Sequence, residues 1–303
     1  MMKINIAILL LFCHFFIACK TKEGVENPEN KTDQGLKKEI DVAKSLKEKT
    51  ALIKTINAYT VNSLADGVRE INLKYTNNKN QQMAIFLFEV NLKNKNIAIK
   101  PLMPNGGKSY GRQSVPVMME KNVFEGYQIL GATNGDFFDS VTGEPRGLVY
   151  INGEAIRPVI LTGWAFFAID KNGYPLISGS SLYAQYSASI LHALGGRQIL
   201  VTGGQEIKQT DATIEPRTGI GYTSDNIVYM LVADGREENY SNGLSYAEMG
   251  SLMKALDVKE AINIDGGGSS TFVVNTDKII VKNRPSDGTP RQVANGWAIC
   301  VKK

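Results

Sequence analysis

Histidine is almost absent from this chain of 303 residues, which contains only His14 and His192. A histidine-rich zinc site is therefore excluded, and so is any catalytic triad that needs more than His192. Charge of one sign is not in excess either, because 34 Lys and Arg residues stand against 30 Asp and Glu residues, a net charge of +4. With so small a charge and no Lys/Arg cluster, nucleic acid is not an expected partner.

Cysteine is also scarce, and the three cysteines are Cys13, Cys19 and Cys300. The first two belong to an N-terminal leader, so a mature chain has no pair of free thiols with which to form an intramolecular disulfide. Cys300 lies in an apolar stretch, 297–301, that predicts a terminal strand. We therefore expect a buried, unreactive thiol there.

Residues 1–19 have the pattern of an export signal, with Lys3 near the start and then a mostly apolar run that is too short and too interrupted to span a membrane. The ending Phe16-Ile17-Ala18-Cys19 resembles the lipobox of bacterial lipoproteins. This resemblance implies lipidation of Cys19 and a lipid-anchored location in the bacterial cell envelope, on its periplasmic or cell-surface side. The alternative is an ordinary signal peptide that is cut at another small residue.

The rest of the chain divides into three parts. Residues 20–35 are polar and predict a tether. Apolar residues spaced among Lys and Glu over 36–58 predict a helical N-terminal segment, which is taken to extend over 36–80. From 81 to 303, short apolar runs are separated by turn signals, and Asn152-Gly153 and Asn172-Gly173 indicate hairpins.

Helices are expected at three places in the main part of the chain, at 114–124, 181–194 and 245–256. Ser245 and Glu248 have the spacing of a capping box, which predicts where the last of these helices begins. Strands outnumber helices and hairpins dominate. The predicted fold class is therefore α+β: a single domain with a mixed, largely antiparallel sheet and a few packed helices, preceded by a helical N-terminal segment.

Glycine, by contrast, is plentiful at 29 residues, and four polar, Gly-rich segments lie at the ends of apolar strands. Loops at strand ends are where a rigid scaffold usually presents reactive groups. The first segment, 134–147, contains Asn134, Asp136 and Glu144 and offers several carboxylates beside an arginine. An exposed acidic loop is the plain structural alternative.

The second segment, 215–221, contains Arg217 and Thr218. A planar guanidinium can grip a phosphate or a carboxylate with two hydrogen bonds, although pairing with a neighbouring acid would explain Arg217 equally well. The third segment, Asp234-Gly235-Arg236, follows an apolar strand. Asp-Gly is also a common turn, so this motif is weak by itself.

The fourth segment is the most specific and reads Asn263-Ile264-Asp265-Gly266-Gly267-Gly268-Ser269-Ser270-Thr271. Asp265 ends a buried strand, and the three glycines expose successive backbone N–H groups that can form a concave anion site. Two serine hydroxyls add further donors. A tight turn needs one glycine and not three, and the lack of a following lysine excludes a Walker loop.

Together these segments resemble the phosphodiester glycosidase family, in matching order from about residue 83 to residue 302. The matching stretches are Asn134-Gly135-x-Phe137-Phe138, Arg217-Thr218-x-Ile220-Gly221, Asp234-Gly235, Gly243-Leu244-Ser245, the segment Asn263 to Thr271, and Arg284-Pro285-Ser286-Asp287. The resemblance implies that 81–303 is a catalytic domain that hydrolyses a sugar-1-phosphodiester to the sugar and a phosphomonoester. Asp136 departs from the family pattern, which usually has a small residue there.

The chemistry of such a reaction indicates which residues to consider. The anomeric C–O bond breaks through an oxocarbenium-like state that a nearby carboxylate stabilises or attacks, and the charge of the leaving phosphate must be held. The candidate catalytic acids are Asp265, Asp234 and Glu144. The candidate residues for substrate and phosphate binding are Asn134, Asp136, Arg217, Thr218, Arg236, Asn263, Gly266, Gly267, Gly268, Ser269 and Ser270.

We expect no cofactor and no metal for this reaction. The expected partners are a sugar-phosphodiester substrate from a glycan or a cell-envelope polymer, and the membrane through the lipid anchor. Two other functions stay open: a metal-dependent phosphodiesterase in which Asp136, Asp234 and Asp265 hold a divalent cation, and a non-catalytic lipoprotein that binds glycan or cell wall. In each case we expect the four segments to converge on one cleft.

Overall fold

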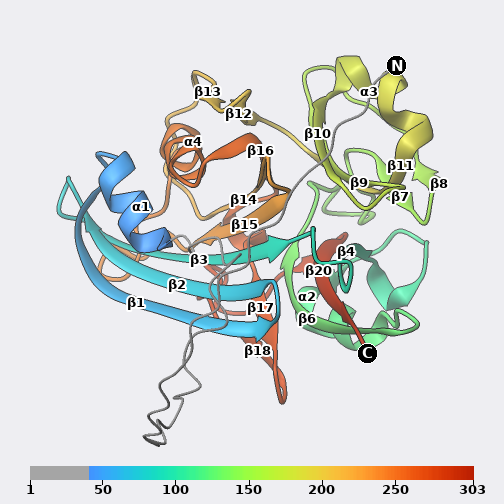
Figure 1. Cartoon of the computed structure of the whole chain (residues 1–303), viewed down its shortest axis with the longest axis horizontal. Helices are drawn as coiled ribbons and strands as arrows, with labels where there is room; N and C mark the ends of the chain where they lie inside the picture. The colour runs from blue at the N-terminus through green and yellow to red at the C-terminus, as the bar shows by residue number, and fades with distance from the viewer. Residues whose placement is uncertain (1–40) are drawn as a thin grey trace, which may run out of the picture. The chain divides into compact units, whose positions relative to one another are not determined.

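The structure, a computed structural model, describes residues 41–303, which form mainly antiparallel β-sheets (Figure 1). Strands make up 47% of it and helices 16%, so the α+β class predicted from the sequence is wrong and the domain is sheet-dominated. The predicted antiparallel pairing is confirmed in every sheet. The predicted leader, the tether and Cys19 lie outside the described residues.

The largest sheet has eight strands in the order β1-β2-β3-β15-β14-β16-β12-β13. Its strands are β1 (Ile53–Ala65), β2 (Val68–Asn77), β3 (Gln82–Asn91), β12 (Ile199–Thr202), β13 (Gln205–Glu206), β14 (Arg217–Thr223), β15 (Ile227–Ala233) and β16 (Val258–Ile264).

The helical segment predicted for 36–80 is wrong over most of its described length. Only α1 (Val42–Lys49) is helical, and it begins at Asp41, whose side chain accepts a hydrogen bond from the Lys44 N–H. The chain then forms the long β1–β2 hairpin. In β2 the apolar residues Ile71, Leu73 and Tyr75 alternate with polar ones, which is the period of a strand with one buried face.

Two five-stranded sheets and one two-stranded ribbon complete the fold. One five-stranded sheet contains β10 (Pro175–Gly179), β9 (Ala165–Asp170), β11 (Ile190–Gly196), β7 (Val149–Ile151) and β8 (Glu154–Arg157), in that order. The other contains β18 (Ile279–Val281), β17 (Phe272–Asn275), β6 (Tyr127–Asn134), β20 (Gly296–Lys302) and β4 (Ile97–Leu102). The ribbon pairs β19 (Gln292–Val293) with β5 (Gln113–Ser114).

The remaining helices are short. They are α2 (Val115–Lys121), α3 (Tyr183–Tyr186), α4 (Tyr246–Ala255) and four 3₁₀ turns at Pro104–Gly106, Ser180–Leu182, Ser187–Ser189 and Gly267–Ser269. The helix predicted at 181–194 is wrong: α3 is a single turn, and the chain enters β11 at Ile190. The capping box at Ser245 and Glu248 is confirmed, with both of its reciprocal hydrogen bonds formed.

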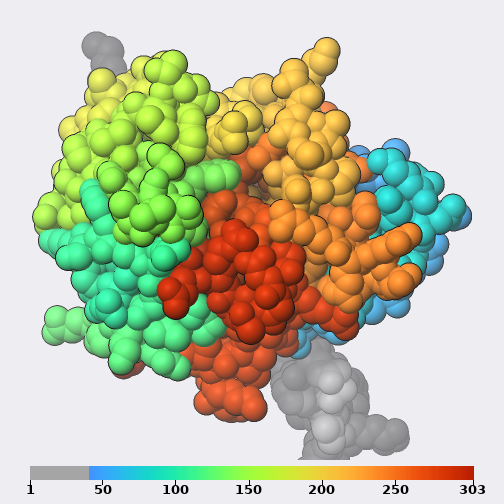
Figure 2. Space-filling model, turned by 180° about the vertical axis from the view of Figure 1, so that it is seen from behind, coloured from blue at the N-terminus to red at the C-terminus, as the bar shows by residue number. Residues whose placement is uncertain are grey.

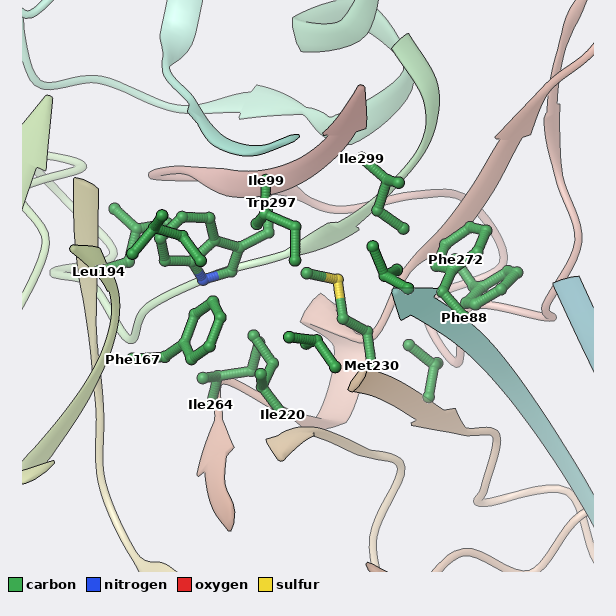
Figure 3. Close-up of a cluster of buried hydrophobic side chains, with 14 of the residues drawn as sticks. Phe88, Ile99, Phe167, Leu194, Ile220, Met230, Ile264, Phe272, Trp297 and Ile299 are labelled. Carbon is green, nitrogen blue, oxygen red and sulfur yellow. The ribbon is translucent and has the colours of Figure 1, made fainter. Parts of the chain in front are cut away.

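Three sheets share one apolar core, as Figure 3 shows. Phe88 from the large sheet stacks on Phe272 from the β6 sheet, with ring centroids 3.9 Å apart. Trp297 and Phe167, from the two five-stranded sheets, meet edge to face at 5.1 Å. On its other face the large sheet is covered by α1 and α4 in a second apolar cluster. Burial on both faces holds the strand ends of the large sheet in fixed positions.

The described chain ends in the buried strand β20, and Cys300 within it is a buried free thiol, as predicted. Burial raises the pKa of this thiol to about 12, so it stays protonated and unreactive at neutral pH. None of the helices in residues 41–303 is long and apolar enough to cross a membrane.

Candidate active site

Asn134, the last residue of β6, connects three of the four polar segments. Its Nδ2 donates to the carbonyl of Asp265 at 2.7 Å, and its Oδ1 accepts from Thr218 Oγ1 at 2.9 Å and from the Thr271 N–H at 3.1 Å. Thr218 Oγ1 also lies 3.2 Å from Ser270 Oγ. All of these side chains except Asp265 are buried. Asn134 therefore holds the ends of β6, β14 and β16 together.

Asp265 follows β16 at this junction. Its N–H donates to the carbonyl of Gly135 at 3.0 Å, and its carboxylate accepts from the Gly266 N–H at 3.0 Å and from the Ser269 hydroxyl. Burial raises the pKa of this carboxyl to about 6, although these hydrogen bonds and Arg291 act in the opposite direction. The residue is still partly exposed, so a ligand can reach it.

The glycine triplet is explained by two arginines that lie against the loop. A Cβ on Gly267, whose φ is +60°, would lie 3.2 Å from Arg236 Nη2, and a Cβ on Gly268 would lie 2.1 Å from Arg291 Nη2. Neither site has room for a side chain without moving a guanidinium. The N–H groups of Gly266, Gly267, Ser269 and Ser270 donate within the protein, so the predicted row of free N–H donors is not present there. The two guanidinium groups are the part of this arrangement that is suited to a phosphate.

Both arginines are oriented by acids and keep part of each guanidinium exposed. Arg236 Nε donates to Glu215 at 2.6 Å, and Arg291 Nε donates to Asp287 at 2.7 Å. Arg291 Nη1 also lies 3.4 Å from Ser269 Oγ. Their side chains are 47% and 40% exposed, so the outer N–H groups face solvent and can contact a ligand.

Asp136 lies beside Asp265 but is fully buried. Its Oδ2 accepts from the Gly147 N–H at 2.6 Å, whereas its Oδ1 has no hydrogen-bond partner among the described residues. Burial raises the pKa of Asp136 to about 8, and the nearby Asp265 charge adds to the rise. At neutral pH this carboxyl is therefore mostly protonated, and its free oxygen Oδ1 is the one that can carry the proton.

Figure 2 shows that the yellow-green, gold, orange and red parts of the chain, to which these segments belong, meet on one face around a shallow hollow. The hydrogen bonds of Asn134, Asp265 and Thr218 join the first, second and fourth segments, and Arg236 brings the third against Gly267. The four segments therefore lie together, as predicted, whereas a cleft that they share stays a prediction.

Comparison with known proteins supplies the family. The sequence profile of the phosphodiester glycosidase family matches residues 127–300, more than half of the chain. The chain belongs to the phosphodiester glycosidase family. The resemblance predicted from the motifs is thereby confirmed.

Two relatives and one solved structure show how far the similarity extends. N-acetylglucosamine-1-phosphodiester alpha-N-acetylglucosaminidase from Mus musculus is 28% identical over 198 residues, which are 56% of this chain and 37% of the relative. An uncharacterised SPbeta prophage-derived protein of Bacillus subtilis is 25% identical over 66% of this chain and 35% of its own length. The chain thus spans less than two fifths of either relative.

The structural similarity covers more of the molecule. The catalytic domain of the zebrafish N-acetylglucosamine-1-phosphodiester alpha-N-acetylglucosaminidase, auto-inhibited by its pro-peptide, aligns with a TM-score of 0.62. The alignment covers 84% of this chain and 87% of the zebrafish chain at 22% identity. The chain therefore shares the sheet-dominated fold of that domain.

The stem of the Arg217 side chain packs beside Gly266, where an added Cβ would lie 3.8 Å from Arg217 Cδ, but its guanidinium points away from the glycine loop. Its Nε donates to the carbonyl of Leu244 at 3.1 Å, its Nη2 donates to that of Thr213 at 2.8 Å, and the guanidinium lies 3.8 Å from the Tyr246 ring centroid. Neighbouring residues of a strand point to opposite faces, so Arg217 points away when Thr218 points to Asn134. The predicted phosphate contact of Arg217 is not supported by this geometry, and Arg236 and Arg291 are the arginines whose guanidinium groups lie against the glycine loop.

Asp234 and Glu144 are held by structural partners. The Asp234 carboxylate is buried and accepts from Asn283 Nδ2, the Arg284 N–H and the Tyr240 hydroxyl at 2.8 to 3.0 Å, which are three of the about four hydrogen bonds that a carboxylate can accept. Glu144 pairs with Arg157 at 3.0 Å. Both carboxylates thus have structural partners, and neither prediction of a catalytic role is supported by this geometry.

Asn263 has a structural task as well, because its Oδ1 accepts from the Gln198 N–H at 2.7 Å and its Nδ2 donates to the carbonyl of Ile264 at 2.9 Å. The metal-site alternative does not fit the donor set. Within residues 41–303 there is no group of three or more His, Cys, Asp or Glu side chains placed to hold an ion. Asp234, one of its three proposed ligands, is buried and already accepts three hydrogen bonds.

Sequence reasoning missed three residues of the site. Arg291 lies 26 residues beyond Asp265, and the only signal near it was the motif Arg284-Pro285-Ser286-Asp287, whose Asp287 orients it. Trp164 packs edge to face on Phe137, with centroids 5.5 Å apart, next to Asp136. The guanidinium of Arg197 lies 5.9 Å from the Trp164 ring. Nothing in the spacing of Trp164 or Arg197 indicates this position.

Proposed function

We propose that this protein hydrolyses a sugar-1-phosphodiester at the bond between the anomeric carbon and the phosphate oxygen. Water supplies the oxygen that bonds to the anomeric carbon, and the phosphate leaves with the electron pair of the broken bond. The products are the free sugar and a phosphomonoester. Membership of the phosphodiester glycosidase family supports the reaction class.

The observation that carries the proposal is the placing of an accessible carboxylate, Asp265, next to a glycine loop flanked by Arg236 and Arg291. The guanidinium groups of Arg236 and Arg291 hold the phosphate in both the ester and the leaving group. Ionised Asp265 then faces the positive charge that develops at the anomeric carbon. A phosphate needs little protonation to leave, since its second pKa is about 6.

Asp136 and the aromatic pair complete the assignment of roles. Because Asp136 is mostly neutral at pH 7, it adds no second negative charge that would repel ionised Asp265 or the phosphate. Phe137 and Trp164 are partly exposed and offer an apolar wall beside the carboxylates, against which a sugar ring can pack.

The decisive experiment is a substrate panel with detection of both products. The purified protein is incubated with sugar-1-phosphodiesters, beginning with N-acetylglucosamine-1-phosphodiesters because the curated relatives are named for that substrate. Equal amounts of free sugar and phosphomonoester are expected. Release of a sugar 1-phosphate instead would mean cleavage on the far side of the phosphorus and would overturn the proposal. Binding without either product would favour the non-catalytic alternative.

We also propose that Cys19 carries a lipid that anchors the protein in the bacterial cell envelope. The support is the apolar leader and its Ala18-Cys19 ending. Cys19→Ser is expected to abolish metabolic labelling with a fatty acid and to release the protein from membranes or leave it unprocessed. Unchanged labelling in this variant would rule the anchor out.

A further inference from the structure

A second cavity lies at the opposite end of β6 from the candidate active site. It has a volume of about 250 Å³ and opens between the edge strand β4, the turn after β9 and the start of β11. Tyr127, at its rim, begins β6, and Asn134 ends the same strand seven residues later, roughly 23 Å away at 3.3 Å per residue. The cavity is therefore separate from the glycine loop.

The floor of this cavity is apolar and its rim is basic. The apolar lining residues are Leu92, Ile97, Ile99, Ile169 and Leu191, and the charged lining residues are Lys95, Lys100 and Lys171. No carboxylate lines it. The nearest acid in the turn, Asp170, already accepts hydrogen bonds from the Asn172 and Tyr174 N–H groups.

The three lysines have no ion-pair partner among residues 41–303. Lys100 lies 4.8 Å from the Tyr127 ring centroid and Lys95 lies 4.8 Å from that of Tyr174, so aromatic faces help to hold both ammonium groups at the rim. Seven of the other sixteen described lysines form ion pairs, as Lys93 does with Asp225 at 2.6 Å. An anion among Lys95, Lys100 and Lys171 would therefore meet three unpaired ammonium groups and no competing carboxylate in the cavity lining.

A buried histidine forms part of the cavity wall, although its unpartnered ring nitrogen is itself buried and does not open into the cavity. His192 is 3% exposed and its Nδ1 accepts a hydrogen bond from the Asn152 N–H at 3.3 Å, so the proton of the neutral ring is on Nε2. Nε2 has no partner among the described residues. Burial, with Lys100 nearby, lowers the pKa of His192 to about 3, so the ring stays neutral and keeps this tautomer at physiological pH.

We propose that this cavity binds a small amphiphilic anion, with its carboxylate or phosphate head among Lys95, Lys100 and Lys171 and its apolar body on the floor of β4, β9 and β11. The proposal does not depend on the reaction at the glycine loop. Strand β11 connects the cavity with the candidate active site, because it runs from His192 in the cavity wall to Gly195, which packs against Asp136.

The test uses three probes of one length: hexanoate, hexyl phosphate and hexanol. Isothermal titration of the full chain is expected to show saturable binding of both anions and at least tenfold weaker binding of hexanol. Hexyl phosphate is also titrated into an Arg291→Met variant. Binding at the glycine loop is expected to be lost in this variant, whereas binding in the cavity should remain. Equal affinity for hexanol and hexanoate would overturn the proposal, and so would the absence of saturable anion binding.

Variants locate the site. Lys100→Met with Lys171→Met keeps most of each apolar stem and removes two charges, and we expect it to weaken hexanoate at least tenfold. The matched control Lys278→Met changes an exposed lysine on a different turn and should leave the affinity unchanged. Because the double variant alters only the rim, its thermal midpoint should match that of the control. Unchanged hexanoate affinity in a folded double variant would remove this cavity as the site.

Binding to lipid vesicles distinguishes a free small molecule from a lipid head group as the source of the anion. The protein is mixed with vesicles of phosphatidylglycerol or of phosphatidylcholine, and binding is followed by co-sedimentation. A free small molecule is the expected ligand, so soluble hexanoate should bind whether or not vesicles do. Binding to anionic vesicles, lost in the double variant while hexanoate and hexyl phosphate fail to bind, would replace a soluble ligand with a lipid head group and overturn the proposal.

Discussion

Strands β15 and β16 lie in the same sheet, and each is followed directly by Asp-Gly. The two aspartate carboxylates nevertheless have different surroundings. Asp234 is buried and accepts three hydrogen bonds from side chains and backbone. Asp265 is partly exposed and is bonded only by its own loop. Burial raises the pKa of both to about 6. Because the two pKa values rise alike, the pKa shift does not distinguish a structural from a reactive carboxylate. The number of hydrogen bonds that each carboxylate accepts and the exposure of each residue do distinguish them.

The comparison is tested most strongly by Asp265→Asn, which removes the charge and nearly keeps the shape. We expect turnover per folded molecule to fall by more than ~100-fold, the scale of losing one preorganised electrostatic group. In the unaltered enzyme, kcat/KM should rise as pH passes about 6, because the ionised form is the active one. Asp277→Asn, at an exposed turn, is the control and should change neither quantity. Near-native turnover in folded Asp265→Asn would remove Asp265 from the mechanism.

The next largest effect distinguishes the phosphate-binding role proposed for Arg291 from the structural role of Arg217. Arg291→Met is expected to weaken binding of the phosphomonoester product about 10- to 100-fold, because a charge-assisted hydrogen bond of ~1.5–3 kcal/mol is lost. Its side chain is 40% exposed, so the melting temperature should hardly change. Arg217→Met should do the reverse, lowering the melting temperature because two backbone carbonyls lose a buried donor. If Arg217→Met weakened product binding more than Arg291→Met, the two assignments would have to be exchanged.

Asp234→Asn tests whether the Asp234 carboxylate stabilises the fold and takes no part in the reaction. An amide in place of the carboxylate turns one acceptor into a donor, which then faces the Arg284 N–H or Asn283 Nδ2. We expect a loss of stability on the order of 1–3 kcal/mol, measured by denaturant unfolding. Turnover per folded molecule should stay within a few fold of the original. A loss of turnover as large as that of Asp265→Asn, without destabilisation, would return Asp234 to the reaction.

A fourth effect, on the pH dependence of stability and not on turnover, concerns Asp136. The pKa of this carboxyl rises from 3.8 to about 8 on folding, so the folded state holds the proton more tightly than the unfolded state. Its contribution to stability is therefore present at low pH and is lost between about pH 4 and pH 8, at up to ~1.4 kcal/mol per pH unit. Asp136→Asn cannot ionise, so its stability relative to the original should increase over that range. A constant difference across pH 4–8 would show that Asp136 is not buried as a neutral acid.

Features that depend on neighbours in the chain could be predicted from the sequence. The Asn152-Gly153 hairpin has φ of +52° and +81° at its two residues, and the capping box begins α4 at Ser245, because a turn or a cap is formed by a few consecutive residues. The same holds for the Asp265 loop, where three glycines in a row signal a close approach to the backbone. Such local patterns also carried the family resemblance.

The tertiary structure alone decided which side chains the site contains. Arg217 and Thr218 are adjacent, yet only Thr218 faces Asn134, because the two faces of β14 are buried against different clusters. Residues 53–77 became strands and not helix because β2 pairs with β3 and buries Ile71 and Leu73. Arg291 reaches Gly268 from a remote part of the chain. Hydrogen-bond occupancy, burial and strand direction are set by contacts between distant segments, which no local pattern in this sequence contains.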